Sequence, residues 1–421
     1  MRQARESNGG DGYRFPSEGG KQASSTRGDN TSGTRGDAAE RDERLDFLRG
    51  LVICVLVIIH FEVVSLYTFL AWERVGFISG GEGFVILSGV VLGMVSRKRV
   101  ATRGWAYSNA RLVDRAAQLY RVNLAIIASF ALLRLVPWLE TREVVSFTDR
   151  FAQQTYPLYP AWSEGFYTVV GRMLLLRAGP HQVQILGLYV VLLLLTPLAL
   201  RMLYDKRAGL LLAGSWGLYF AYKLSPWQPT GAQFESAFPL LAWQVIYLHG
   251  LAAGYHREAV ERFLRGPRGR WVFGLAVVLF LGFFVLAQNT SNPIVPRFAR
   301  LSWLEPETFN RLRTAWFDKN TLGVLRILNY FAALLVGYAL LDRFWPFFQR
   351  TLGWLLIPLG QASLYVFIVH VYLVLLVSNF RPFTFQASGW DIALNTLVHT
   401  AVLLALWLMV RTKFLFRLIP R

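Results

Sequence analysis

The segment "RLDFLRGLVICVLVIIHF", residues 44–61, places a histidine inside a run that otherwise reads as a membrane-spanning helix. Between Arg49 and His60 the chain has only apolar residues and one glycine. Eleven residues at ~100° each bring both side chains onto one helix face, about 16 Å apart along the axis. Arg49 is then expected near a membrane surface and His60 near the membrane middle. A histidine at that depth is either a reactive group or a structural one bonded to a neighbouring helix.

Apolar runs continue through the chain and define its fold class. Hydrophobic residues make up 54% of 421 and the mean hydropathy is +0.37, which is not typical of a soluble domain. About 18 or more apolar residues cross a hydrocarbon core of ~30 Å, and their backbone must be helical. We therefore predict an all-α, polytopic integral membrane helical bundle with about ten transmembrane helices. The predicted spans are residues 47–70, 75–96, 119–139, 182–202, 208–224, 237–255, 271–288, 323–342, 361–379 and 391–410.

Basic residues between the spans predict the orientation. With a cytoplasmic N-terminus, every inside loop holds at least two Lys or Arg close to a span, as in "RMLYDKR" at residues 201–207. This pattern indicates that both termini are cytoplasmic. Two outside loops, residues 140–181 and 289–322, are long and carry Trp, Tyr, Pro and acidic residues. Such loops are more typical of ordered caps than of linkers.

Residues 1–43 nearly lack large apolar side chains, so we expect a disordered cytoplasmic tail ahead of a membrane domain at residues 44–421. No apolar segment follows Met1, as a cleaved signal peptide would require. The net charge of +18 lies mainly in the tail and inside loops, where it sets topology and meets anionic lipid. We therefore predict a lipid bilayer and not nucleic acid as the partner of these charges. The single cysteine, Cys54, allows no intramolecular disulfide, and no metal site is predicted.

A carboxylate, Glu82, lies in the second predicted span, at a depth that we expect to match that of His60. Gly89 and Gly93 follow on the same helix face, and small residues let helix backbones approach closely. This face is therefore expected to point toward protein. There Glu82 could orient the imidazole and raise its basicity. The alternative is an internal salt bridge, or a protonated carboxyl that serves packing.

The segment "NARLVDRAAQLYRVNL", residues 109–124, carries a cationic stripe at the cytoplasmic end of the third predicted span. Arg111, Arg115 and Gln118 fall on one helix face at i, i+4 and i+7. Paired arginines bind phosphates through bidentate hydrogen bonds, so the stripe is a candidate donor-binding site. The alternative is ordinary positive-inside charge, partly paired with Asp114.

Two further spans carry polar residues that are candidates for an additional role. His370 follows Ser363 by seven residues on the same face, near the middle of its span, and packing explains it as well as chemistry does. Trp243 and Gln244 lie in the outer half of another span. Buried glutamine most often serves helix association.

The span that starts at the outer mouth with His181 carries Tyr189 inside it, and we expect His181 to be merely interfacial. The rest of the chain has no Walker loop, Rossmann fingerprint, serine-nucleophile elbow or pair of metal-binding histidines. The residues thus favour chemistry by a membrane-embedded base.

Six segments, in chain order, resemble successive motifs of the OpgC family, part of the acyltransferase-3 superfamily of integral membrane acyltransferases. The resemblance covers residues 41–410, and Arg49 and His60 match the Arg-x10-His signature of the superfamily. The segments are "RDERLDFLRGLVICVLVIIH", "GGEGFVILSGVVLGMV", "RAAQLYRVNLAI", "ILGLYVVLLLLTPLAL", "FPLLAWQVIYLHG" and "LGQASLYVFIVH".

The resemblance implies a ten-helix enzyme of the bacterial cytoplasmic (inner) membrane. It would move an acyl group, succinyl or acetyl, from cytoplasmic acyl-CoA to a hydroxyl of a periplasmic or cell-envelope glucan. Succinyl-CoA or acetyl-CoA is then a donor substrate, and no cofactor is bound permanently. By matching positions, the resemblance implies that His60 is the essential histidine, Arg49 its partner arginine, Arg111 and Arg115 the arginine pair, and Glu82 the acidic residue before "FVILSG".

These inferences combine into one hypothesis. The phosphates of the donor bind the cytoplasmic arginines, and its pantetheine arm follows the Arg49 face to His60. His60, oriented by Glu82, removes the proton of the acceptor hydroxyl. A polytopic proton-coupled transporter or flippase is the alternative, because it would also place ionisable residues at mid-membrane.

Overall fold

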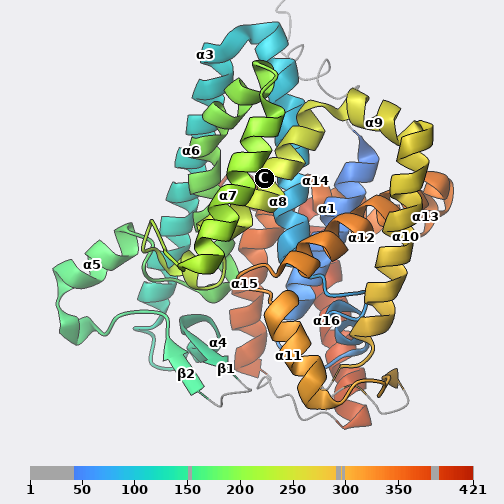
Figure 1. The fold of residues 1–421 in the computed structure, drawn as a ribbon. Coiled ribbons are helices and arrows are strands. Elements are labelled where there is room, and N and C mark those ends of the chain that lie inside the picture. Colours follow the sequence, from blue (N-terminus) through green and yellow to red (C-terminus); the bar gives the residue numbers. More distant parts are fainter. Residues whose placement is uncertain (1–41, 150–153, 291–294, 296–298, 381–387, 421) are drawn as a thin grey trace, which may run out of the picture. The chain divides into compact units, whose positions relative to one another are not determined.

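The computed structural model describes residues 42–149, 154–290, 295, 299–380 and 388–420. Residues Glu43–Arg421 form one compact unit, and the tail predicted at residues 1–43 falls almost wholly outside the described residues. The unit is built almost entirely from helices (Figure 1), which confirms the all-α prediction.

The described α-helices are α1 (Glu43–His60), α2 (Leu66–Ala71), α3 (Gly80–Leu133), α4 (Arg142–Val145), α5 (Phe166–Leu174), α6 (Gln184–Tyr204), α7 (Ala208–Leu224), α8 (Leu240–Tyr255), α9 (Arg257–Arg265), α10 (Pro267–Ala287), α11 (Pro306–Trp316), α12 (Val324–Arg343), α13 (Trp345–Thr351), α14 (Gly353–Gln361), α15 (Ser363–Phe380) and α16 (Gly389–Arg411). The described residues also contain an antiparallel strand pair, β1 (Ser146–Asp149) and β2 (Gln154–Pro157), in which Ser146 lies opposite Pro157. Short 3-10 helices are η2 (Trp162–Glu164), η3 (His181–Val183) and η4 (Gln233–Ser236).

Six helical segments in the described part of the chain are long and apolar enough to cross a membrane: Gly80–Leu133, His181–Tyr204, Pro267–Ala287, Val324–Arg343, Ser363–Phe380 and Gly389–Arg411. Helix α7 has 17 residues and α8 has 16, or about 25 Å at 1.5 Å per residue, which is shorter than a hydrocarbon core. Helix α1 carries four charged residues in its first two turns. The structure thus indicates a membrane protein, and the number of ten spans stays a prediction.

The second and third predicted spans are two legs of α3. The prediction of an inside loop between these spans is wrong. The helix continues through this segment and breaks only at Gly104, whose φ of 81° suits glycine. Gly93 in the first leg lies against Tyr255 at the end of α8, and Trp105 at the start of the second leg stacks edge-on with Tyr204 at the end of α6. The two legs meet at the top of Figure 1, with α6 and α8 beside them.

The first leg of α3 packs backbone to backbone on α8. Gly89 and Gly93 face Gly250 and Gly254, and a Cβ at Gly93 would lie 2.7 Å from the Tyr255 nitrogen. Helices approach this closely only where both carry small residues at i and i+4. The prediction that the glycine face of this span points toward protein is confirmed.

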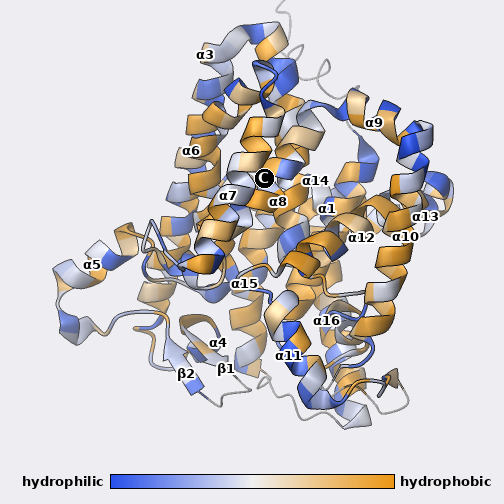
Figure 2. Cartoon of the chain, viewed as in Figure 1, coloured by the Kyte–Doolittle hydropathy of each residue, from blue (hydrophilic) through white to orange (hydrophobic). Residues whose placement is uncertain are grey.

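Polar elements gather at the two ends of this helical unit (Figures 1 and 2). Helix α9 and the break in α3 lie at one end, and the strand pair and α11 lie at the other. Between them, α6, α8, α10 and α12 are mainly hydrophobic in Figure 2. The two long loops predicted as ordered caps therefore do contain secondary structure.

Candidate active site

Helix α1 ends at His60, and this ending decides the environment of the histidine. The span predicted at residues 47–70 is wrong as one continuous helix, because Glu62 has a left-handed φ of 46° and α2 begins only after Ser65. Ser65 is an extended N-cap whose hydroxyl accepts from the N–H groups of Tyr67 and Thr68. A residue in a continuing helix cannot adopt that cap conformation. His60 therefore lies at a helix end, next to buried irregular backbone.

The partner of His60 is a second histidine, His370 of α15. His60 Nδ1 and His370 Nε2 are 2.7 Å apart, and the two ring planes are inclined by only 19°, with centroids 5.0 Å apart. His370 is fully buried, whereas His60 is partly exposed. Nδ1 of His370 has no hydrogen-bond partner among the described residues, and the backbone carbonyls of Val366 and Phe367 act on this imidazole electrostatically. This arrangement favours donation from His60 Nδ1–H to His370 Nε2, which leaves His60 Nε2 as the basic nitrogen.

Arg49 also links α1 to α15, at a different height along the two helices from the His60–His370 contact. Its Nη2 donates to Ser363 Oγ at 2.5 Å. Helices α1 and α15 therefore run in the same direction, with the Arg49–Ser363 contact at one level and the His60–His370 contact at the other. A Cβ at Gly50 would collide with the α14 backbone, so the close packing of α14 on α1 depends on this glycine. Ser363 and His370, predicted to share a face, both reach the Arg49–His60 face.

The residues of the predicted cationic stripe have different surroundings in the structure. Arg115 is half-buried, interacts electrostatically with Arg49, and donates from Nη1 to Gln118 Oε1 at 2.6 Å. Arg111 is exposed and lies 3.8 Å from Asp114, one helical turn along. Arg115 and Gln118 thus lie on the Arg49 side of α3, whereas Arg111 has the surroundings of an ordinary surface charge.

The hypothesis that Glu82 orients the imidazole of His60 is wrong, because both carboxylate oxygens of Glu82 bond other residues. Oε1 of Glu82 accepts from Arg326 Nε, and Oε2 accepts from the backbone and hydroxyl of Ser79 in a capping box at the start of α3. Arg326 Nη1 also donates to Glu73 Oε1 at 2.8 Å. The physical reason is charge: a buried carboxylate gains more from a guanidinium than from a neutral imidazole. Glu82 therefore forms an internal salt bridge, which was the alternative predicted from the sequence.

The remaining candidates hold helices together. Tyr189 donates to the Phe84 carbonyl at 2.7 Å, which ties α6 to α3. Gln244 bonds the hydroxyl and the carbonyl of Ser215, which ties α8 to α7. Trp243 donates to the Asn320 carbonyl at 2.7 Å. Among the described residues, none of these three side chains hydrogen-bonds to His60, so their contacts indicate a role in helix packing.

The sequence did not predict a role for two residues, His181 and Arg326. His181 is not merely interfacial, because its ring lies edge-on to that of His60 with centroids 6.4 Å apart, and its Nε2 is 3.3 Å from Glu62 Oε1. Arg326 is fully buried and organises the Glu82 network. The signal for Arg326 was present, since a charge within the predicted span 323–342 is a functional candidate by default.

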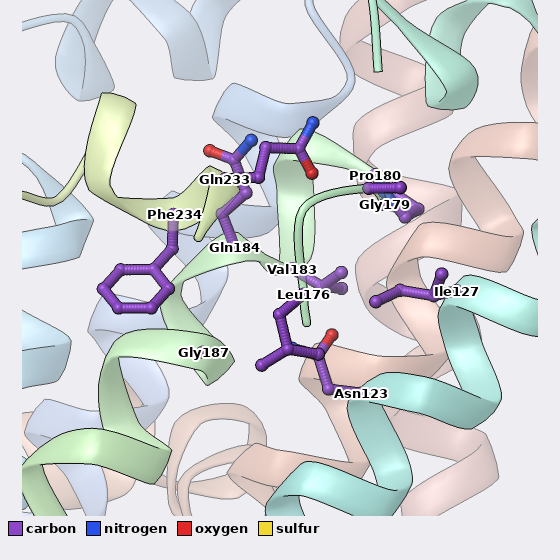
Figure 3. Close-up of a pocket in the computed structure, with 11 residues that line it drawn as sticks. Asn123, Ile127, Leu176, Gly179, Pro180, Val183, Gln184, Gly187, Gln233 and Phe234 are labelled. Carbon is purple, nitrogen blue, oxygen red and sulfur yellow. The ribbon is translucent and has the colours of Figure 1, made fainter. Parts of the chain in front are cut away.

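A small polar cavity lies beside the loop that carries His181 (Figure 3). It encloses about 10 Å³, room for about one water molecule. Its polar lining is made of three carboxamides, those of Asn123, Gln184 and Gln233, and Gly179 and Gly187 leave the space open. Carboxamides both donate and accept hydrogen bonds, so the cavity suits a hydroxyl or a water molecule.

Fold and site together define a helical membrane protein in which His60 contacts the buried His370 and shares one helix face with Arg49. A family model described as OpgC protein matches residues 41–417. The chain therefore belongs to the OpgC family, and this membership indicates a transferase that modifies glucans. The searches of curated proteins and of solved structures returned no significant match.

Proposed function

We propose that this protein is an O-acyltransferase of the acyltransferase-3 type in the bacterial inner membrane. It moves a succinyl or acetyl group from cytoplasmic acyl-CoA to a hydroxyl of a periplasmic or cell-envelope glucan. The observation that carries the proposal is the contact between the partly exposed His60 and the buried His370. An acyltransferase needs a neutral base whose second nitrogen is held in one tautomer, and this pair supplies one.

The proposed reaction uses His60 Nε2 as the base. Nε2 takes the proton of the acceptor hydroxyl while the oxygen attacks the thioester carbonyl. A C–O bond forms, the C–S bond breaks, and the departing CoA thiolate takes the proton from His60, which is neutral again for the next cycle. His370 accepts the Nδ1–H hydrogen bond throughout and stabilises the transient imidazolium. Glu82 has no part in this proton transfer.

The donor approaches from the end of α1 that carries Arg49. Arg115 and Arg49 repel each other electrostatically, and Arg49 also lies 3.7 Å from Asp46, so the two guanidiniums offer a phosphate positive charge from two helices. The ~16 Å from Arg49 to His60 suits an extended pantetheine arm. The acceptor hydroxyl arrives from the opposite side, where His181 and the carboxamide-lined cavity lie.

The test measures acyl transfer from labelled acyl-CoA to glucan by purified protein in proteoliposomes. His60→Ala is expected to lower turnover by at least about 100-fold, since general base catalysis supplies about 10²–10⁴. His249→Ala is the matched control, because His249 is a half-buried histidine of α8 whose hydrogen bonds, within the described part of the chain, go only to Val245 of its own helix and to Trp216. Gel filtration and acyl-CoA binding establish that both variants are folded.

Full transfer by folded His60→Ala would overturn the proposal. Movement of glucan across the membrane without consumption of acyl-CoA would instead favour the transporter or flippase.

A further inference from the structure

The segment that follows His60 is irregular and buried. Its backbone conformation is unfavourable unless other groups stabilise it. Phe61, Val63, Val64 and Ser65 are each at most 2% exposed, and Glu62 has the left-handed φ of 46°. Backbone polar groups outside a helix at this depth need partners from elsewhere, because hydrocarbon offers none. We call residues 61–66 the His60 turn.

Helix α16 supplies those partners. Asn395 Nδ2 donates to the Val64 carbonyl at 2.8 Å, and Thr396 Oγ1 accepts from the Leu66 N–H at 3.0 Å. His399 Nδ1 is 2.9 Å from the Ser65 hydroxyl. Residues 392–410 of α16 are otherwise apolar, apart from Thr400, which bonds the Tyr67 hydroxyl at 3.0 Å. The polar residues of this stretch therefore all serve the segment that follows His60.

The hydrogen-bond directions at His399 are set by its neighbours. The Ser65 hydroxyl oxygen already accepts from two backbone N–H groups, so its hydrogen donates to His399 Nδ1. His399 Nε2 then carries the proton and has no hydrogen-bond partner among the described residues, and the backbone carbonyl of Ile58 acts on the His399 imidazole electrostatically. The His399 ring also lies edge-on to Phe61, with centroids 5.8 Å apart. His399 thus contacts the chain on both sides of His60.

We propose that His399 and Asn395 are positioning residues for the histidine pair, and that α16 ends α1 at His60 so that its imidazole faces His370. This inference rests on the proposed function. The helix would otherwise continue through "FEVVSLY", as the apolar run 47–70 predicts, and the ring of His60 would lose its fixed place beside α15. Partners that orient metal-binding histidines change activity by about 10- to 100-fold when they are removed, and we expect partners that position a catalytic histidine to act on a similar scale.

The test compares His399→Phe, His399→Asn and, as the matched control, His249→Phe. His399→Phe removes the Ser65 contact at similar ring size, and we expect kcat to fall about 10- to 100-fold while KM for acyl-CoA stays within twofold. His399→Asn places an amide oxygen where Nδ1 lies, so most of the loss should be restored. His249→Phe should retain wild-type kcat. Hydrogen–deuterium exchange of peptides covering residues 61–68 should be faster in His399→Phe alone.

Wild-type kcat in His399→Phe, or unchanged exchange at residues 61–68, would overturn the positioning role. A loss of kcat that His399→Asn does not restore would overturn it as well. These results are distinct from failure of the proposed function, which would appear as full transfer by His60→Ala. The exchange measurement does not depend on activity at all.

Discussion

At the residue scale, the buried charge of Arg326 is tolerated because it meets carboxylates from a distant part of the chain. Arg326 is 0% exposed and lies between the carboxylates of Glu73 and Glu82, and Arg313 contacts Glu73 at 3.2 Å from outside. The pKa of Glu73 is raised by burial and lowered by the charges of Arg326 and Arg313, with a net lowering, so this carboxylate stays ionised. The network fastens the turn before α3 to α12.

The two arginines of the predicted stripe should differ in their effect on the donor. Arg115→Ala is expected to weaken acyl-CoA binding about 10- to 100-fold, because a charge-assisted hydrogen bond contributes about 1.5–3 kcal/mol. Arg111→Ala should change it by less than about threefold, since Arg111 is exposed and has Asp114 beside it. Titration of the purified variants with acyl-CoA measures both. Equal losses would contradict the placement of the donor phosphates beside Arg49.

At the element scale, glycines decide how closely the first leg of α3 packs on α8. The leg begins with Glu82 and its capping box, and the close approach to α8 sets its position. Each of the two helices presents a glycine pair at i and i+4 to the other. Backbone-to-backbone packing of this kind leaves no room for a side chain.

A larger residue at Gly93 should therefore separate the two helices. Gly93→Leu is expected to cost about 1–3 kcal/mol or more, because the added atoms meet backbone that cannot turn aside. Gly274→Leu on α10 is the control, since a Cβ at Gly274 would have nothing within 4 Å. Thermal unfolding in detergent should show a lower midpoint for Gly93→Leu only. Similar midpoints for both variants would refute the packing argument.

At the scale of the whole helical unit, the polar elements mark two ends that should face opposite sides of the membrane. The break in α3 and α9 carry basic residues, and α11 lies in a long predicted outside loop. A donor from the cytoplasm and an acceptor from outside would then reach His60 from opposite ends.

The predicted orientation can be read by labelling introduced cysteines. Thr102→Cys, near the break in α3, should react with a membrane-impermeant maleimide only after lysis, whereas Thr308→Cys in α11 should react in intact spheroplasts. Both side chains are exposed. The wild-type protein is the control, because its one cysteine, Cys54, is buried. The reverse labelling pattern would show that the orientation is inverted.

The sequence by itself determined most helices and the faces that their residues share. The predicted span 208–224 has the bounds of α7, and the spans at 391–410 and 323–342 match α16 and α12 within two residues at each end. Local pattern suffices here, because an apolar run long enough for a membrane must be helical and its period places residues 49 and 60 on one face.

Only the tertiary structure decided where α1 stops and which residues meet. His60 and His370 are 310 positions apart, and Glu82 and Arg326 are 244 apart. Helical arithmetic says which residues share a face, but not which face of another helix they contact. The end of α1 at His60 likewise depends on Asn395, Thr396 and His399 of α16, whose hydrogen bonds make irregular backbone stable inside the protein.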